Sequence, residues 1–353
     1  MKKALVTGSS GLVGSETVRF LCAKGFKVFG IDNDTRGYLF GKDASTSGVK
    51  VHLNNEFKNF FNINIDLRIY QVVKDTFSEY GPFDFIVHAA AQPSHEWSIT
   101  HTLEDFELNA MATVNVLECY KNFSPKAILI YISSSKVYGD LVNTLPLEEL
   151  ETRFDLPQNH PFYEGVDENF GRLDGKLHSL FGASKACSDI MAGEYGRYFN
   201  LPIAIFRPVC VSGATHQGAS AHGYLSYLVK CIALGEPYTI NGYNGKQVRD
   251  NLHAFDLVTA FWEVFQDPSG SYGEAYNIGG GRLSNNSILE AIKEAENILG
   301  KRAKVGYSSI HRKGDHKWCI YSSSKFKKRY PNWKIAYDNK QLMKNICKVY
   351  ENA

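Results

Sequence analysis

Three glycines near the N-terminus have the spacing of a loop that binds phosphate. Gly8, Gly11 and Gly14 follow the apolar residues 4–6 and open a helical stretch. Gly8 permits a tight turn, Gly11 lets the backbone approach a pyrophosphate, and Gly14 lets the helix pack closely on the strand. The amides of the first helical turn then point at the phosphates. This pattern predicts a dinucleotide site that also includes Ser10, Leu12 and Val13.

An acidic residue ends the second apolar segment and indicates which dinucleotide is bound. Asp32 follows residues 27–31 and stands 18 residues after Gly14. Its carboxylate can accept hydrogen bonds from both ribose hydroxyls and would repel a 2′-phosphate, which favours NAD over NADP. A glycine turn without a ligand is the alternative, but strand, turn, helix and acid occur here together. Asn33, next to Asp32, is expected at the same site.

Three later strand ends carry groups that suit a cofactor and a sugar. The small side chains of Ala89, Ala90 and Ala91 let the backbone lie against a cofactor. The segment 133–135 offers serine hydroxyls, and 181–185 opens a helix with Phe181 and Lys185 on one face. Ligands of doubly wound sheets bind beyond the carboxyl ends of the strands, so we expect these groups at one edge.

Strands alternate with helical stretches through the first 210 residues, which predicts an α/β fold with a doubly wound parallel sheet of the Rossmann type. Long helices are expected at 102–121 and 182–199, and a substrate-side loop at 140–180. A smaller C-terminal α/β domain is expected to bind substrate. The predicted NAD-binding domain comprises 1–207 and about 250–272, and the predicted substrate domain comprises 208–249 and 273–353.

Composition restricts the partners and the compartment. The 353-residue chain has a net charge of +2, which argues against nucleic acid as a partner. It has no apolar run long enough for a membrane span and no signal-peptide pattern. The seven cysteines are scattered without metal-ligand or redox spacing. We therefore expect no metal site, no membrane partner, and reduced thiols in a cytoplasmic protein.

Further motifs accompany these residues along nearly the whole chain. They are TGSSGLVG at 7–14, HAAAQ at 88–92, SSSKVYGD at 133–140, FGASK at 181–185, FRPVCVSG at 206–213, GKQVRDNLHAFD at 245–256 and YNIGGG at 276–281. In combination the chain resembles the extended short-chain dehydrogenase/reductase family, the NAD-dependent nucleotide-sugar epimerases and dehydratases. The stretches KVYGD and NGYNGKQVRDNLHAFD look most like its CDP-paratose (tyvelose) 2-epimerase branch.

The resemblance implies a role for each matching residue. Lys185 binds the nicotinamide ribose and lends positive charge, while Ser134 hydrogen-bonds the reacting sugar oxygen. Arg249 binds the diphosphate, a task that suits a forked cation. Asp66 holds the adenine amine. The cofactor set implied by the family also includes Leu67, Asn109 and Pro208, and the substrate set includes Gln92, Ser135, Cys210 and His253.

Phe181 departs from the family pattern, which has tyrosine four residues before the lysine. That tyrosine takes a proton from the sugar hydroxyl, and phenylalanine has no proton to exchange. Three interpretations are open: an engineered trap, a natural variant in which another group is the base, or an inactive relative that holds the cofactor. The candidate bases are Tyr138, Tyr163, His178 and His95.

Ser135 and Lys136 stand where the family's dehydratases carry an Asp-Glu pair, so the resemblance disfavours dehydration. It implies an epimerase that oxidises one carbinol of a nucleotide-diphosphate sugar and returns the hydride to the other face. A net NAD-dependent oxidoreductase or lyase, and a non-catalytic protein that binds NAD and sugar nucleotide, are the alternatives. Relatives pair through the helices at 102–121 and 182–199, which implies a homodimer.

Overall fold

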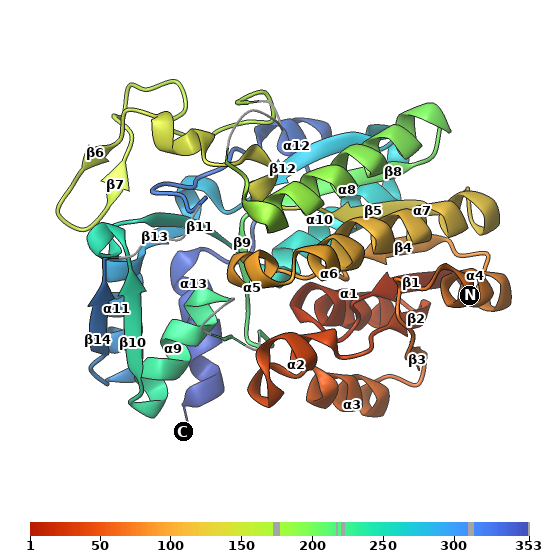
Figure 1. Cartoon of the computed structure of the whole chain (residues 1–353), viewed down its shortest axis with the longest axis horizontal. Helices are drawn as coiled ribbons and strands as arrows, with labels where there is room; N and C mark the ends of the chain where they lie inside the picture. The colour runs from red at the N-terminus through yellow and green to blue at the C-terminus, as the bar shows by residue number, and fades with distance from the viewer. Residues whose placement is uncertain (172–176, 217, 220–222, 310–313, 352–353) are drawn as a thin grey trace. The chain divides into compact units, whose positions relative to one another are not determined.

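The computed structural model describes residues 1–171, 177–216, 218–219, 223–309 and 314–351 (Figure 1). The chain forms two compact units. Unit 1 comprises Met1–Val137, Leu180–Arg207 and Leu257–Tyr276, and unit 2 comprises Tyr138–Ser179, Pro208–Asp256 and Asn277–Ala353. These boundaries differ from the predicted domains at 138–179 and 250–256, which group with unit 2, and at 273–276, which group with unit 1.

A seven-stranded sheet runs in the order β12-β8-β5-β4-β1-β2-β3. The pairings of β1 with β2 and β4, of β2 with β3, and of β5 with β4 and β8 are parallel. The order reverses at β1, which is the doubly wound arrangement predicted from the sequence. The strands are β1 (Lys3–Thr7), β2 (Lys27–Ile31), β3 (Phe60–Ile63), β4 (Phe85–His88), β5 (Ile128–Ile132), β8 (Ile203–Pro208) and β12 (Glu274–Ile278).

The central strands of this sheet are apolar because helices cover both of its faces. Every residue of β4 and β8 is buried, and Leu5, Ile86 and Leu129 lie at the centre of one core cluster. The helices of this part are α1 (Leu12–Ala23), α2 (Thr35–Phe40), α3 (Ser47–Glu56), α4 (Tyr70–Tyr80), α5 (His95–Thr100), α6 (Thr102–Phe106), α7 (Ala112–Phe123), α8 (Ser179–Tyr198) and α10 (Ala254–Gln266).

The helix predicted at 102–121 contains a wider turn that the sequence pattern did not reveal. A π-helical turn, Glu107–Met111, joins α6 to α7 and contains Asn109. Such turns insert one residue into the helical repeat and often occur at functional sites. The helix predicted at 182–199 is confirmed as α8. In Figure 1, α7 and α8 lie side by side, and Tyr195 on α8 donates its hydroxyl proton to Glu118 on α7.

Unit 2 has its own sheets and its own core. A three-stranded sheet has the order β13-β11-β9, and β10 pairs with β14 in parallel. Its core cluster packs α9, α11 and α13 around residues such as Leu228, Ile292 and Leu342. The elements are β6 (Glu148–Glu149), β7 (Phe154–Asp155), β9 (Cys210–Ser212), α9 (Tyr224–Leu234), β10 (Pro237–Asn241), β11 (Val248–His253), β13 (Asn285–Ser287), α11 (Ile288–Leu299), β14 (Lys304–Ser308), α12 (Ser324–Arg329) and α13 (Asn339–Cys347).

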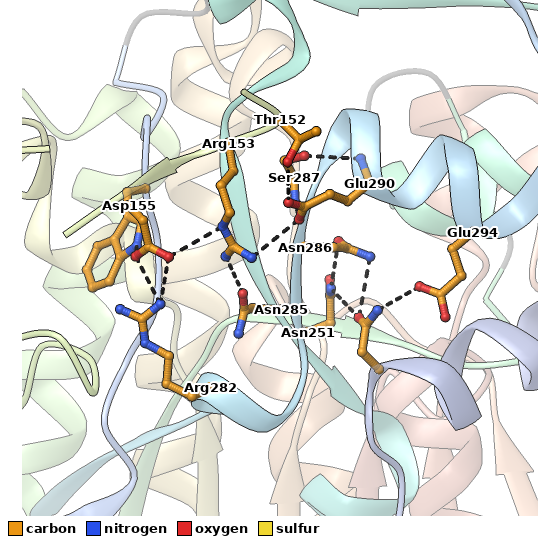
Figure 2. A network of polar contacts seen from close by, with 12 residues as sticks. Thr152, Arg153, Asp155, Asn251, Arg282, Asn285, Asn286, Ser287, Glu290 and Glu294 are labelled. Atoms are coloured by element: carbon orange, nitrogen blue, oxygen red, sulfur yellow. Dashed lines mark hydrogen bonds and ion pairs between the residues drawn. The ribbon is translucent and has the colours of Figure 1, made fainter. Parts of the chain in front are cut away.

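A buried polar network explains why the segment after residue 137 groups with unit 2 (Figure 2). The Asp155 carboxylate accepts two hydrogen bonds of 2.9 Å from Arg282 and one of 3.1 Å from the Trp318 indole. Arg153, on the same short hairpin, forms an ion pair with Glu290 at 3.4 Å. Charge-assisted bonds of this kind are strong when they are shielded from water. They fix β7 to residues far away in the sequence.

Candidate functional site

The glycine turn between β1 and α1 leaves no space for a side chain at Gly8 or Gly14. Gly8 has φ of +65°, and a Cβ atom there would lie 2.9 Å from the backbone of Ala90. A Cβ atom on Gly14 would lie 1.9 Å from the carbonyl oxygen of Gly8. The backbone that follows β4 therefore packs directly against the turn.

The start of α1 has the features of a phosphate-binding helix terminus. Gly11 is the N-cap residue of α1, and no side chain caps the helix. Leu12 and Val13 lie half-buried in its first turn. The buried Ser10 hydroxyl has no hydrogen-bond partner among the described residues. The amides of a first helical turn lack partners within the helix and favour an anion. The turn therefore fits the pyrophosphate of a dinucleotide.

Asp32 is fixed at the end of β2 by two backbone amides. Its carboxylate accepts hydrogen bonds of 2.9 Å from the N–H groups of Ser10 and Asp34. Burial raises the pKa of Asp32, and these two donors oppose the shift. The neighbouring Asn33 is exposed and its side-chain oxygen accepts a hydrogen bond from the Thr35 hydroxyl at 2.5 Å. The carboxylate is thus linked to the glycine turn, where a ribose next to the pyrophosphate would lie.

We expect Asp32→Ala to weaken NAD binding by about 10- to 100-fold, because hydrogen bonds to a charged group contribute about 1.5–3 kcal/mol. The preference for NAD over NADP should also fall, since the repulsion of a 2′-phosphate is removed. Isothermal titration with both dinucleotides measures the two effects. Asn54→Ala, at an exposed position of α3, is the control and should change neither affinity. An unchanged ratio of the NAD and NADP affinities in Asp32→Ala would contradict the assignment.

Asp66 and Leu67 follow β3 at the expected adenine end. Burial alone would raise the pKa of Asp66, but Arg68 outweighs it and the net shift is downward. Arg68 donates to the Asp66 carboxylate at 2.7 Å and 3.0 Å. The Asn115 amide donates to the carbonyl of the buried Leu67 at 2.9 Å. These bonds fix the loop after β3 and keep Asp66 ionised as an acceptor.

Lys185 is buried at the carboxyl end of β5. Its ammonium donates to the Ile132 carbonyl at 2.6 Å and lies 4.5 Å from the centre of the Tyr131 ring. Burial lowers the pKa of Lys185 to about 7, and Asp189 and Asp105 oppose this shift. Ser134 is half-buried beyond the same strand, where its hydroxyl accepts the Lys136 N–H at 3.1 Å. Ser135, next in the chain, is buried.

Phe181 is buried one helical turn before Lys185 and contacts a histidine. The rings of Phe181 and His95 meet edge to face, with centroids 5.0 Å apart. Of the four alternative bases, His95 belongs to unit 1 with Phe181, whereas the other three belong to unit 2. There, the Tyr138 hydroxyl donates to Asn277 at 2.8 Å, and Arg282 lies over the Tyr163 ring at 3.6 Å. His178 is the third candidate base in unit 2.

Sequence reasoning missed Asp105, which joins three of the site segments. Its buried carboxylate accepts hydrogen bonds from Ser184 at 2.6 Å and from the Gln92 amide at 2.5 Å. Asn109 donates to Ser184 at 3.0 Å and accepts the Gln92 N–H at 2.9 Å. Gln92 and Asn109 therefore both form hydrogen bonds with other residues of the protein. The available signal was the spacing of Asp105 and Asn109, four residues apart on one helical face.

Unit 2 places Arg249 on β11 as a fixed cation. One guanidinium nitrogen donates to both oxygens of Asp315 at 2.8 and 2.9 Å, and another donates to the His316 carbonyl at 2.7 Å. Burial alone would lower the pKa of Arg249, but Asp315 outweighs it and the pKa is raised. The adjacent Asp250 accepts the N–H groups of Gly280 and Gly281, and burial raises its pKa to about 8.

The predicted substrate residues Cys210 and His253 lie in the three-stranded sheet of unit 2, whose second segment begins at Pro208, a predicted cofactor residue. Cys210 on β9 stands opposite Asn251 on β11, and Pro208 ends β8. His253 ends β11, stacks on Tyr337 with ring centroids 3.9 Å apart, and burial lowers its pKa. The predicted residues therefore form two groups. Pro208, Cys210, Arg249 and His253 lie in unit 2, while the glycine turn, Asp32, Asp66, residues 89–92, Asn109, Ser134, Ser135, Phe181 and Lys185 lie in unit 1.

None of the helices in the described part of the chain is both long and apolar enough to cross a bilayer. Within the same residues, no group of three or more His, Cys, Asp or Glu side chains is arranged to hold a metal ion.

Comparison with known proteins gives consistent results. The model of the NAD dependent epimerase/dehydratase family matches residues 4–279. The CDP-paratose 2-epimerase of Salmonella typhi is 32% identical over 83% of each chain. The UDP-glucuronate 4-epimerase of Thermodesulfobacterium geofontis is 28% identical over 93% of this chain and 90% of its own. The UDP-glucose 4-epimerase of Thermus thermophilus, crystallised with NAD, superposes with a TM-score of 0.79 at 22% identity and covers 99% of both chains. The chain belongs to the NAD dependent epimerase/dehydratase family.

Proposed function

We propose that the protein is an NAD-dependent nucleotide-sugar epimerase. The observation that carries this proposal is the buried Lys185 at the end of β5, in the same unit as the glycine turn and Asp32. When bound, NAD supplies a reversible hydride acceptor. The turn 7–14 would hold its pyrophosphate, Asp32 a ribose, and Asp66 the adenine. Lys185 would hold the second ribose and place a positive charge beside the reacting sugar, whose oxygen Ser134 would contact.

The proposed substrate is a nucleotide-diphosphate sugar, and a CDP sugar oxidised at C2 is the first candidate. The resemblance to CDP-paratose 2-epimerase supports this choice, since that relative is 32% identical. Arg249, fixed by Asp315, is the proposed diphosphate contact, and Gln92, Ser135, Cys210 and His253 are proposed to border the sugar nucleotide. Ser135 and Lys136 supply no carboxylic acid, which favours epimerisation over loss of water.

The test is to incubate the purified protein with CDP-, UDP- and dTDP-sugars and to follow inversion by proton NMR. Because the cofactor is regenerated in each turnover, the protein should retain NAD through purification and need none added. Accumulation of NADH, followed by its absorbance, with a sugar nucleotide would instead indicate a net oxidoreductase. Tight sugar-nucleotide binding without turnover, also in Phe181→Tyr, would indicate a non-catalytic binding protein.

We also propose a homodimer that pairs through α6, α7 and α8. Apolar side chains on these helices and the intervening turn are exposed: Leu103 at 73%, Ile190 at 48%, Met111 at 45% and Phe106 at 42%. Exposed apolar side chains grouped on adjacent helices are typical of a protein interface. A second copy of the chain would cover them if each subunit paired α8 and the continuous helix formed by α6, the π-helical turn and α7, which gives a symmetric four-helix contact.

The dimer proposal predicts that Leu103→Asp combined with Ile190→Asp yields a monomer, because two carboxylates per subunit would be buried without partners. Light scattering after size-exclusion chromatography at micromolar concentration measures the mass. The control is Val51→Asp, which changes an equally apolar and exposed residue on α3. A wild-type mass equal to that of one chain, 39.6 kDa, would contradict the dimer.

The proposed compartment is the cytoplasm, and the proposed role is in carbohydrate biosynthesis. All seven cysteines are free, and five of them are buried. Reduced, widely spaced thiols are typical of proteins in reducing compartments. Nucleotide sugars, the proposed substrates, are activated donors for such biosynthesis.

A further inference from the structure

Phe181 leaves the proposed epimerase without a phenol at the position that faces the sugar in the resembling family. Removing a hydride from a carbinol needs a group that takes the hydroxyl proton, and such a group contributes about 10²–10⁴ in rate. We propose that His95 is this acid–base group, and that it takes and returns the sugar hydroxyl proton in place of the missing phenol. This inference rests on the epimerase function proposed above and concerns the same site.

The first support is the direct contact between the two rings. The imidazole of His95 meets the phenyl ring of Phe181 edge to face at 5.0 Å. The Phe181 side chain is only 6% exposed, so it forms an apolar wall rather than a surface residue. A substrate hydroxyl directed to this wall would meet the imidazole as the adjacent proton acceptor.

The second support is that one hydroxyl ties the backbones of the two residues together. Ser98 donates its hydroxyl proton to the His95 carbonyl at 2.7 Å and accepts the Phe181 N–H at 3.2 Å. Ser94 caps α5 by accepting the Trp97 N–H at 3.2 Å, which fixes the helix at its first residue, His95. The position of His95 relative to Phe181 is therefore set by local bonds.

The third support is the buried hydrogen-bond network of Asp105, which contacts both the segment before α5 and the start of α8. Gln92 donates to Asp105 and to the Ser94 carbonyl, at 2.5 Å and 2.9 Å, just before α5 begins. Ser184, one turn after Phe181 on α8, donates to the other oxygen of Asp105 at 2.6 Å. A catalytic imidazole needs such supporting contacts to keep its geometry fixed. The hydrogen bonds of Gln92 to Asp105 and to the Ser94 carbonyl thus help to position His95.

The proton chemistry of imidazole suits this position. As the carbonyl forms, the hydroxyl proton would pass to a ring nitrogen of His95 and the O–H electron pair would become the second C–O bond, while NAD, when bound, would supply the acceptor for the hydride of the same carbon. On return, the hydride adds to the opposite face of the carbonyl and imidazolium protonates the oxygen. An imidazole has an ordinary pKa of about 6.5, so it needs no neighbour to become basic at neutral pH, whereas a phenol with a pKa of about 10 does.

His88, on β4, is a histidine of this unit with a structural role. Both ring nitrogens of His88 lie in hydrogen bonds with threonines, at 2.7 Å to Thr7 and 3.0 Å to Thr113. Burial lowers the pKa of His88 to about 3, so it stays neutral and links β4 to β1 and α7. His95 stands at the start of α5 beside Phe181, and Asp105 and Lys185 are charged groups on the adjoining elements α6 and α8.

The test compares His95→Gln with His101→Gln, an exposed histidine that stacks on Trp97 at the other end of the same helix. His95→Gln should lower kcat by about 10²–10⁴-fold while NAD content and CDP affinity stay unchanged, and His101→Gln should stay near wild type. Phe181→Tyr added to His95→Gln should recover a large part of the lost rate. Full kcat in His95→Gln would overturn the proposal.

Two further readouts separate proton transfer from a structural role. In the wild type, kcat/KM should rise with pH through the imidazole pKa, and this limb should be absent from the residual activity of His95→Gln. Lys185 titrates in the same range, so only the limb lost with His95 counts. Proton NMR with CDP bound should show the His95 ring titrating between about pH 5 and 8. A ring that never titrates there would overturn the proposal, whereas a wild type that turns over no sugar nucleotide would contradict the epimerase function itself.

Discussion

Gly14→Ala is expected to abolish NAD retention and to lower the free energy of unfolding by about 3 kcal/mol or more. The added Cβ atom would lie 1.9 Å from the Gly8 oxygen, 2.7 Å from the Gly8 carbonyl carbon and 2.9 Å from the Ser9 Cα. All three are backbone atoms, so no side chain can rotate away and α1 must move away from the turn at Gly8 and Ser9. Overpacking of this kind costs about 1–3 kcal/mol and sometimes more.

The measurements for Gly14→Ala are urea unfolding and the NAD content of the purified protein. Gly48→Ala is a matched control, because Gly48 lies in α3 and a Cβ atom there meets nothing within 4 Å. It should leave NAD unaffected and stabilise the protein by about 0.5–1 kcal/mol, since glycine is unfavourable in a helix. Wild-type NAD content together with a wild-type unfolding midpoint in Gly14→Ala would show that the turn tolerates a side chain.

Lys185→Met is expected to lower turnover by about 10²–10³-fold, the usual cost of removing one preorganised charge or donor from a site. It should at the same time stabilise the unliganded protein near neutral pH by about 1–3 kcal/mol. Burial lowers the pKa of Lys185 from its ordinary 10.5 to about 7, so folding carries the cost of a desolvated ammonium. The loss of the bond to the Ile132 carbonyl offsets part of this gain.

The pH dependence gives the sharper test of Lys185. Between about pH 7 and 10.5 the unfolded chain binds more protons at this lysine than the folded protein does, so the wild type gains stability as pH rises. Lys185→Met lacks this contribution, and its advantage should be largest below about pH 7 and should vanish above 10.5. Denaturant unfolding at the two ends of this range measures it. Lys126→Met, on the surface, is the control; an advantage that does not change with pH would contradict the lowered pKa of Lys185.

The sheet could be predicted because its strands are short apolar runs separated by helical stretches. Residues 127–132 illustrate this, because a short and continuous apolar run is typical of a strand that is buried on both faces of a parallel sheet. The glycine turn and Asp32 were predictable for a related reason: their signals lie close together in the sequence. The π-helical turn around Asn109 was not, because one added residue hardly changes the apolar spacing of a long helix.

Contacts between distant residues account for what the sequence did not reveal. In the sequence, nothing distinguishes Asp105 from an acidic residue on the surface of a helix. Its burial depends on Ser184, 79 residues away. The membership of 138–179 in unit 2 depends on Asp155 meeting Arg282, 127 residues away. His95 was one of four equal candidates in the sequence, and its contact with Phe181 is what distinguishes it. Pairings of this kind leave no local pattern.

The order in which the seven strands occur in the chain has a consequence for synthesis. The edge strand β12 begins at residue 274, and its neighbour β8 ends at 208. A ribosome that has released the chain as far as the end of β8 has therefore delivered the glycine turn and every strand of this sheet except β12, while β8 still presents an open edge. Open edges invite pairing with other chains. The sheet of the nascent protein thus stays incomplete until β12 has been synthesised, and until then the open edge of β8 can pair with other chains.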